Sequence, residues 1–172
     1  MAAVSLRDAA IARYNITVRP TPITHAAIEK WSAANNIKRI GILCGSYRRN
    51  ATKSNDIDLL VPITSMDAVC RDLKIKLYTS GNTMRSGFVK LGRTYCQIDL
   101  LGYTAENRIC MILHFTGSRE FNIRMRAIAK NKGYLLNQDG LFNKKGQRVR
   151  IRDERDIFVK LAMEYVRADE RK

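Results

Sequence analysis

The stretch GSYRRNATKSNDIDLLV, residues 45–61, constrains the fold of this chain more than any other. It leads into an apolar run that needs burial, and two aspartates alternate with apolar residues just ahead of that run. Side chains of a strand alternate between its faces, so Asp56 and Asp58 share one face while Ile57 and Leu59 point toward the core. The pattern therefore predicts a strand that is anchored in a core and carries two carboxylates on its other face.

Paired carboxylates raise one another's pKa unless a cation lies between them. Mg²⁺ relieves such repulsion and prefers a few carboxylates together with substrate phosphates. Asp99 in TYCQIDLLGY offers a third carboxylate, with Ile98 and Leu100 on the opposite face of an expected neighbouring strand. Three such aspartates suit two metals about 4 Å apart and an in-line phosphoryl displacement. Solvated or helix-capping aspartates are the alternative interpretation of the D-x-D pair taken alone.

The Gly-Ser turn ahead of this strand complements the carboxylates. Gly45 lets the backbone turn sharply and approach a ligand, and Ser46 offers a hydroxyl and an N–H to a phosphate. Arg48 and Arg49 are planar donors suited to phosphate oxygens, and we expect one of them to point inward and the other into solvent. Carboxylates, metal and arginines together predict a triphosphate site.

The charge of the chain indicates a second, larger anion. Lys and Arg number 31 against 16 Asp and Glu, which gives +15 over 172 residues, and both halves of the chain share the excess. Such a charge points to nucleic acid. The four cysteines form no C-x-x-C pair and only two histidines are present, which argues against a zinc module. Because no segment resembles a signal peptide or a membrane span, we expect a soluble, intracellular protein.

The order of the predicted elements indicates an α+β fold. In the first part we expect a helix over 21–36 with Thr21 as its N-cap, strands over 37–45 and 55–63, a short helix over 65–73, and three antiparallel strands over 74–80, 86–92 and 94–103. After a boundary near residue 105 we expect a strand or extended entry over 108–115, a helix over 118–133, a small hairpin within 136–152, and a helix over 153–166 with Ile157, Leu161 and Tyr165 on one stripe.

Three spaced motifs carry a resemblance to a known family. GSYRR followed by NDIDLL resembles the nucleotidyltransferase signature of Gly-Ser, a short helix and D-x-D. HFTGSREFNIRMRAIAKNKGYLLNQDGLF and the final DERDIFVKLAMEYVRADER resemble the thumb of family X DNA polymerases, including beta-type members. The similarity runs from about Ile37 to the C-terminus. It implies a nucleotidyltransferase palm with a small mixed or antiparallel sheet over 1–105, followed by a mostly helical thumb with a small hairpin over 106–172.

The resemblance implies roles for the residues that match the family motifs. Asp56, Asp58 and Asp99 match the metal-binding, catalytic aspartates, and Asp99 is also implied as the base for the primer 3′-hydroxyl. The positions implied for nucleotide binding are Gly45, Ser46, Arg49, Asn55, His114, Phe115, Gly117 and Asn122, and those implied for template or DNA contact are Arg124, Arg126 and Lys130. Independently of the family, Asn122 and Arg126 share a helix face at i and i+4, while Phe121, Met125 and Ile128 mark the buried side.

Several residues depart from the family pattern. Asn55 replaces the usual Gly, His114 replaces the usual Tyr, and Ile123 stands where beta-type enzymes have a Lys near the template. The segment before Ile37 is too short for the N-terminal lyase domain and fingers of cellular members. These features resemble the compact palm-and-thumb viral members of the family. They imply a place in the host cytoplasm or virion for a viral protein, and in the nucleus otherwise.

One principal hypothesis follows. We expect a monomeric, DNA-templated DNA polymerase that binds gapped or primer–template DNA and a dNTP, uses two Mg²⁺ ions with Mn²⁺ as a substitute, and fills short gaps in base excision repair. A template-independent nucleotidyltransferase acting on RNA or a small acceptor is one alternative, against which the Asn122 and Arg126 face argues. The others are a non-catalytic nucleic-acid-binding module, in which aligned aspartates would weaken phosphate binding, and an enzyme with Cys44 as nucleophile and His25 or His114 as base.

Overall fold

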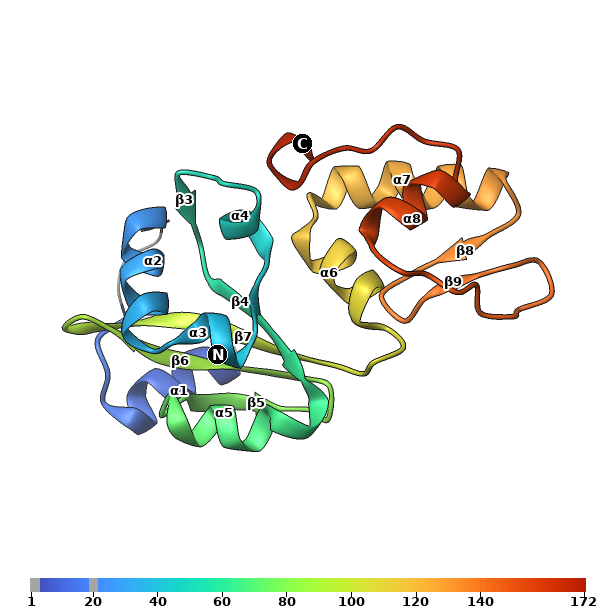
Figure 1. Ribbon diagram of the computed structural model, residues 1–172. Helices are drawn as coiled ribbons and strands as arrows, with labels where there is room; N and C mark the ends of the chain where they lie inside the picture. The colour runs from blue at the N-terminus through green and yellow to red at the C-terminus, as the bar shows by residue number, and fades with distance from the viewer. Residues whose placement is uncertain (1–3, 19–21) are drawn as a thin grey trace.

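The computed structural model describes residues 4–18 and 22–172 and shows two lobes joined by one chain crossing at residues 104–107 (Figure 1). The sheet lobe contains α1 (Leu6–Tyr14), β1 (Ile23–Thr24), α2 (His25–Ala34), α3 (Ile37–Ile40), β2 (Ile42–Leu43), α4 (Gly45–Arg48), β3 (Lys53–Ser54), β4 (Ile57–Pro62), α5 (Met66–Asp72), β5 (Lys76–Ser80), β6 (Met84–Leu91) and β7 (Thr94–Tyr103). The helical lobe contains α6 (Arg108–Thr116), α7 (Arg119–Asn131), β8 (Leu135–Leu136), β9 (Leu141–Phe142) and α8 (Glu154–Lys160). We propose that these lobes are the two domains predicted over 1–105 and 106–172.

A five-stranded sheet of order β2-β4-β7-β6-β5 organises the sheet lobe. Strands β5, β6 and β7 form the predicted antiparallel meander. Strand β7 also pairs with β4 in parallel, which places Asp58 directly beside Asp99. The sheet is therefore mixed, and the fold class is the predicted α+β.

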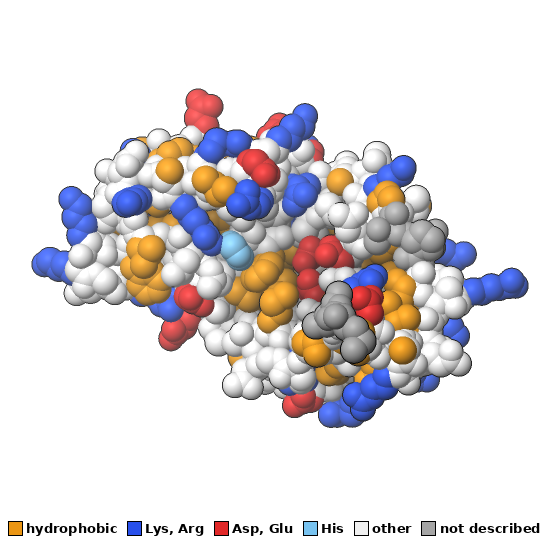
Figure 2. All heavy atoms as spheres, turned by 180° about the vertical axis from the view of Figure 1, so that it is seen from behind, with side chains coloured by type: hydrophobic (Ala, Val, Ile, Leu, Met, Phe, Trp, Pro, Cys, Tyr) orange, Lys and Arg blue, Asp and Glu red, His pale blue; other side chains and the backbone are white. Residues whose placement is uncertain are grey.

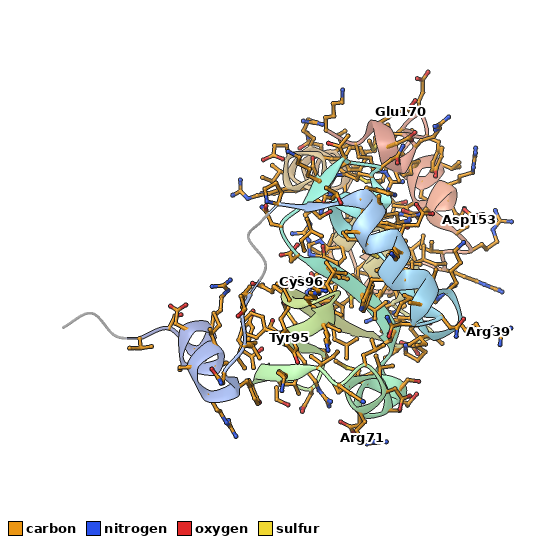
Figure 3. All side chains as sticks on the ribbon, turned by 90° about the vertical axis from the view of Figure 1, so that its left-hand side faces the viewer. Arg39, Arg71, Tyr95, Cys96, Asp153 and Glu170 are labelled. Carbon is orange, nitrogen blue, oxygen red and sulfur yellow. The ribbon has the colours of Figure 1, made fainter. Side chains whose placement is uncertain are left out.

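The two faces of the sheet have different roles. Ile57, Leu59, Ile98 and Leu100 are all 0–1% exposed and pack with residues of α2 and α5 on one face. This alternation with the aspartates confirms the strand pattern seen in the sequence. Helix α1 lies on the other side of the sheet from α2, as Figure 3 shows, and it packs against β5.

The helical lobe has an apolar core of its own. Phe121 and Met125 of α7 pack there with Ile157 and Phe158 of α8, and all four side chains are at most 5% exposed. The predicted hairpin is present as β8 and β9. A small third cluster, which includes Leu60 and Met111, joins the lobes through the contact of α6 with β4.

The first long helix starts later than predicted. It begins at His25, and the Thr24 hydroxyl caps it by accepting a hydrogen bond from the Ala27 N–H at 3.3 Å. Thr21, the predicted N-cap, lies outside the described residues. The start at 21 is wrong because Ile23 and Thr24 instead pair with β3 as an extended segment.

Two further predictions from apolar runs are wrong. Residues 37–45 were expected to form one strand, but Ile37–Ile40 form a helical turn and only Ile42–Leu43 are a strand. Residues 108–115 were expected to be extended, but they lie in α6, where Cys110, Met111, Leu113 and Thr116 are buried. A short continuous apolar run has no period of its own, so it does not separate a buried helix from a buried strand.

The closing helix is shorter than predicted. It ends at Lys160, and Ala162 adopts a left-handed φ of 44°. The predicted apolar stripe still packs as expected, because Ile157 and Leu161 are fully buried and the Tyr165 ring lies 5.1 Å from Phe158. Tyr165 reaches that contact from outside the helix.

Candidate active site

Three carboxylates form the floor of the site. Asp58 on β4 and Asp99 on β7 are register partners on parallel strands, and Asp56 precedes β4 on the same face. Burial raises the pKa of Asp58 to about 7, and the neighbouring charges of Asp56 and Asp99 add to this shift. Burial and then the charge of Asp99 also raise the pKa of Asp56. Burial is the larger cause of both shifts, and repulsion between the carboxylates adds to it, as expected for side chains on a shared face.

The donor chemistry of this floor fits a divalent cation. The Asp99 Oδ1 atom is buried and has no hydrogen-bond partner, and an unpaired buried polar atom is costly. Carboxylate oxygens are also the ligands that Mg²⁺ prefers. Within residues 4–18 and 22–172, no three His, Cys, Asp or Glu side chains converge as a ready ligand set. The chemistry of the donors, rather than a preformed ligand geometry, is therefore what fits the metal.

Gly45 begins α4 in direct contact with this floor. Its φ of 57° is left-handed, and a Cβ atom at this position would lie 1.9 Å from the Asp58 Oδ2. Both the backbone conformation and the space therefore require glycine. The sequence predicted a close approach of this turn to a ligand, and the structure places the turn against a carboxylate.

The two arginines after this turn both reach the helical lobe. The Arg49 Nη1 donates to the Thr116 carbonyl at 2.5 Å, and its charge opposes the rise in the pKa of Asp58. The Arg48 Nη1 donates to the Thr116 hydroxyl at 2.6 Å, and its guanidinium pairs with both carboxylate oxygens of Glu154. The prediction that one of them points into solvent is therefore wrong, because Glu154 holds Arg48 between the lobes.

Glu154 is a residue of this region that sequence reasoning missed. It also accepts a hydrogen bond from Arg171 at 2.8 Å, and the fully buried Arg171 guanidinium lies 5.4 Å from the Phe121 ring centre and 5.6 Å from that of Phe158. Burial alone would raise the pKa of Glu154, but Arg48 and Arg171 outweigh burial and lower it. The sequence shows Glu154 only as an acidic residue in the first turn of a helix, so it carried no signal for this contact.

A cavity of about 650 Å³ opens between the lobes above Asp56 and Asp58, and Asp99 lies beside Asp58 without being among the lining residues described. The cavity is lined by Gly45, Ser46, Arg49, Asn55, Asp56, Asp58, His114, Phe115, Gly117, Arg119, Asn122, Ile123 and Arg126. The structure therefore brings together every position predicted for nucleotide binding. Figure 2 shows one face of the molecule, with acidic side chains gathered near its middle and lysines and arginines spread around them.

Helix α7 supplies the wall of the cavity opposite the carboxylates. The Arg126 Nη2 lies 2.8 Å from the His114 Nδ1, and the Asn122 side chain donates to the His114 carbonyl at 2.7 Å. Because arginine only donates, His114 Nδ1 is the acceptor. Burial and then the charge of Arg126 lower the pKa of His114, so this ring stays neutral at pH 7.

Two residues predicted for DNA contact do not line the cavity, one predicted hydroxyl is bonded elsewhere, and one lining residue was not predicted. Arg124 points away on an exposed face of α7 and donates to the Lys172 carbonyl. Lys130 lies in a neighbouring groove, farther along the same helix. Ser46 lines the cavity, but its hydroxyl donates to the Ser54 hydroxyl at 2.6 Å. Arg119 was missed, although its position one helical turn before Asn122 could have indicated the same face.

The geometry argues against a cysteine nucleophile. Cys44 is 1% exposed, and burial raises the pKa of its thiol to about 12. His25 stacks on the Tyr47 ring at 4.2 Å, and His114 is bound to Arg126. Cys44 is therefore a protonated, buried side chain, as expected for a small apolar residue. In the part of the chain that the structure describes, no helix is long and apolar enough to cross a membrane.

A mixed sheet with in-register aspartates, a Gly-Ser turn against them and a helical lobe over the cavity together define a nucleotidyltransferase-type polymerase. Residues 111–172 match the family model described as DNA polymerase beta thumb. Repair DNA polymerase X of African swine fever virus is 31% identical over 133 residues in isolate Tick/South Africa/Pretoriuskop Pr4/1996, covering 72% of this chain and 76% of that protein. In isolate Pig/Kenya/KEN-50/1950 it is 33% identical over 130 residues, covering 70% and 75%. The chain belongs to the family X DNA polymerases.

A solved structure shows the same fold. Polymerase beta of Leishmania infantum, in a crystal structure described as a ternary P/T complex, superposes with a TM-score of 0.81. The match covers all of this chain and 84% of that one at 20% identity. The predicted resemblance to family X and the predicted fold class are therefore both confirmed.

Proposed function

We propose that this chain is a DNA-templated DNA polymerase that adds dNTPs to a primer 3′-hydroxyl and fills short gaps in base excision repair. The names of the curated relatives support a repair polymerase. The observation that carries the proposal is the pairing of Asp58 with Asp99 beneath a cavity whose opposite wall is formed by α7. The aspartates that would hold the reacting groups and the α7 residues that would face a base pair thereby lie around the same cavity.

The three aspartates would hold the metals. Two divalent ions, Mg²⁺ or Mn²⁺, would supply stabilisation of the attacking and leaving oxygens in an in-line phosphoryl displacement. Asp99 Oδ1, which has no hydrogen-bond partner, is the acceptor for the proton of the primer 3′-hydroxyl. Positioning and electrostatics supply most of the catalysis in such a reaction, so the rigid strands β4 and β7 are suitable supports.

The residues around the turn hold the triphosphate. Arg49 presents a planar guanidinium that suits phosphate oxygens, and its hydrogen bond to the Thr116 carbonyl holds it at the cavity. Gly45 and Ser46 offer the exposed backbone of the turn beside it. Asn55 lines the same wall, just ahead of Asp56.

The helical lobe would position the sugar and the nascent base pair. His114 and Phe115 lie in contact at 4.8 Å between ring centres and line the cavity beside Gly117. Asn122 and Arg126 present hydrogen-bond donors from α7 toward the same space. Donors placed to read a nascent pair are useful only with a template, which favours a templated enzyme over a template-independent transferase.

Primer extension on DNA with a one-nucleotide gap tests the proposal. We expect the wild-type protein to add only the complementary dNTP with Mg²⁺, and Asp99→Ala to reduce the rate at least about 1,000-fold because it removes electrostatic stabilisation. Asp72→Ala removes an exposed aspartate of α5 and should extend like the wild type. A primer without template distinguishes a terminal transferase, and loss of extension with DNA still bound would leave only a binding module.

A further inference from the structure

A second hollow lies on the helical lobe, next to the active-site cavity. This hairpin groove, of about 920 Å³, lies between the C-terminal half of α7 and the β8–β9 hairpin. Arg126 lines both the groove and the active-site cavity, so the two hollows adjoin at that side chain. Lys130 follows one turn later, about 6 Å farther along the helix axis.

The hairpin groove has an apolar part that includes two aromatic rings and an exposed leucine. Leu135 is 60% exposed, although it belongs to a strand with a buried neighbour. Tyr134 and Phe142 are half-buried beside it, and the Arg148 guanidinium lies 5.0 Å from the Phe142 ring centre and steadies that ring. Aromatic rings and an exposed leucine next to a basic cavity are suited to stacking with nucleobases.

The rim of the hairpin groove is mainly cationic. Lys144 lies against Gly133 so closely that a Cβ there would be 2.1 Å from the lysine Cε. Lys144 and Lys130 of α7 are both among the residues that line the groove. Asp139 is the one carboxylate among the lining residues that the structure describes, and it can accept from the amino group of a base. Cationic side chains at the rim and aromatic rings in the lining together favour single-stranded nucleic acid, because its phosphates and its bases use both.

We propose that the hairpin groove binds the unpaired template nucleotides on the 5′ side of the templating base. The inference rests on the proposed polymerase function, because that function places the nascent pair against Arg126. The same function places the primer terminus at Asp99 on the sheet lobe, so we assign the copied duplex to that side of the pair and the uncopied template to the side along α7. At the roughly 3.4 Å spacing of stacked bases, the Lys130 end of the groove is within about two nucleotides of the pair.

Binding of primer–template DNA with different template overhangs tests this site. By fluorescence anisotropy, we expect the wild-type protein to bind a four-nucleotide overhang about tenfold more tightly than a one-nucleotide overhang, since stacking of an extra base adds affinity. Leu135→Asp should abolish this gain because it places a charge on the lining. Val159→Asp is the matched control, since Val159 is 71% exposed on α8 and is not among the groove residues.

A second readout follows the stacking itself. A 2-aminopurine two nucleotides 5′ of the templating base should lose fluorescence on binding the wild-type protein and Val159→Asp, but not on binding Leu135→Asp. The proposed role of the groove would be overturned if Leu135→Asp still bound the longer overhang more tightly. It would also be overturned if the wild-type protein bound both overhangs equally well. Extension on the one-nucleotide gap reports the polymerase function separately. Its absence, with the overhang gain retained, would refute the polymerase and leave the groove as a single-strand site.

Discussion

Gly45 lets the backbone of α4 lie against the Asp58 carboxylate. A side chain here would collide with Asp58 Oδ2, and the left-handed φ of 57° is also unfavourable for any residue with a Cβ. Gly92 also has a left-handed φ, of 67°, but a Cβ there would meet nothing within 4 Å. A comparison of alanine variants at these two positions therefore separates the effect of backbone strain from the effect of a collision with Asp58.

Gly45→Ala should impair catalysis more than folding. We expect both Gly45→Ala and Gly92→Ala to lose about 1–2 kcal/mol of unfolding free energy from the left-handed backbone. Only Gly45→Ala should lose about 100-fold or more in kcat for single-nucleotide extension, because a displacement of about 1 Å at the site has that effect. Urea unfolding and single-turnover extension check the two effects. Equal kcat values for the two variants would show that Asp58 tolerates displacement.

The residues that could be predicted follow a local pattern. The alternation of Asp56 and Asp58 with buried Ile57 is visible over a few positions, and the same holds for Asp99 between Ile98 and Leu100. The partner of Arg48 had no such signal, because Glu154 lies 106 residues away in the chain. Long-range ion pairs depend on how the lobes meet, which no local period encodes.

Helix α7 serves the core and the cavity with separate faces. Its N-cap, Ser118, accepts from the Phe121 N–H at 3.2 Å, and Phe121 and Met125 anchor the helix in the lobe. Arg126 faces the cavity and holds His114, whereas Arg124 faces the C-terminal residue. Two arginines on one helix thus have different expected roles.

Arg126→Ala and Arg124→Ala should differ strongly. Removing Arg126 loses the hydrogen bond to His114 and the donor that we propose faces the nascent pair, so we expect templated insertion efficiency to fall about 100-fold. Arg124→Ala should change it less than about threefold, because Arg124 contacts Lys172 outside the cavity. Steady-state insertion of each dNTP opposite a defined template base checks this. A comparable loss of insertion efficiency in Arg124→Ala would instead support the predicted contact of Arg124 with DNA.

Elements with a clear period or cap were predicted better than short apolar runs. The spacing of Phe121 and Met125 predicted α7, and the glycine-containing turns predicted the antiparallel meander of β5 to β7. Residues 37–45 and 108–115 were misassigned because each is a brief apolar stretch that tertiary contacts turn into helix. The small sheet was still placed correctly, since its longer strands determine it.

Besides the chain crossing, the lobes are joined by the small cluster around Leu60 and Met111, by the bonds of Arg49 and Arg48 to Thr116, and by an ion pair. Figure 1 shows the C-terminal segment returning above α7, toward α4. There Glu154 connects Arg48 of the sheet lobe with the buried Arg171 of the C-terminal segment. Glu154 is 12% exposed in its side chain, so solvent screens these pairs only weakly. The charge of one carboxylate should therefore contribute to the orientation of the cavity walls.

Glu154→Gln should lower stability in a pH-dependent way. Removing this charge leaves Arg48 and Arg171 uncompensated, and we expect a loss of about 3 kcal/mol at pH 7. The folded pKa of Glu154 lies below its unfolded value, so its contribution is complete above the unfolded value and is lost as pH falls through the folded one. In urea unfolding at pH 7, 5 and 3, the difference from wild type should therefore shrink toward pH 3. Glu164→Gln, at an exposed position, should match the wild type throughout. A difference that does not change with pH would assign the loss to packing rather than charge.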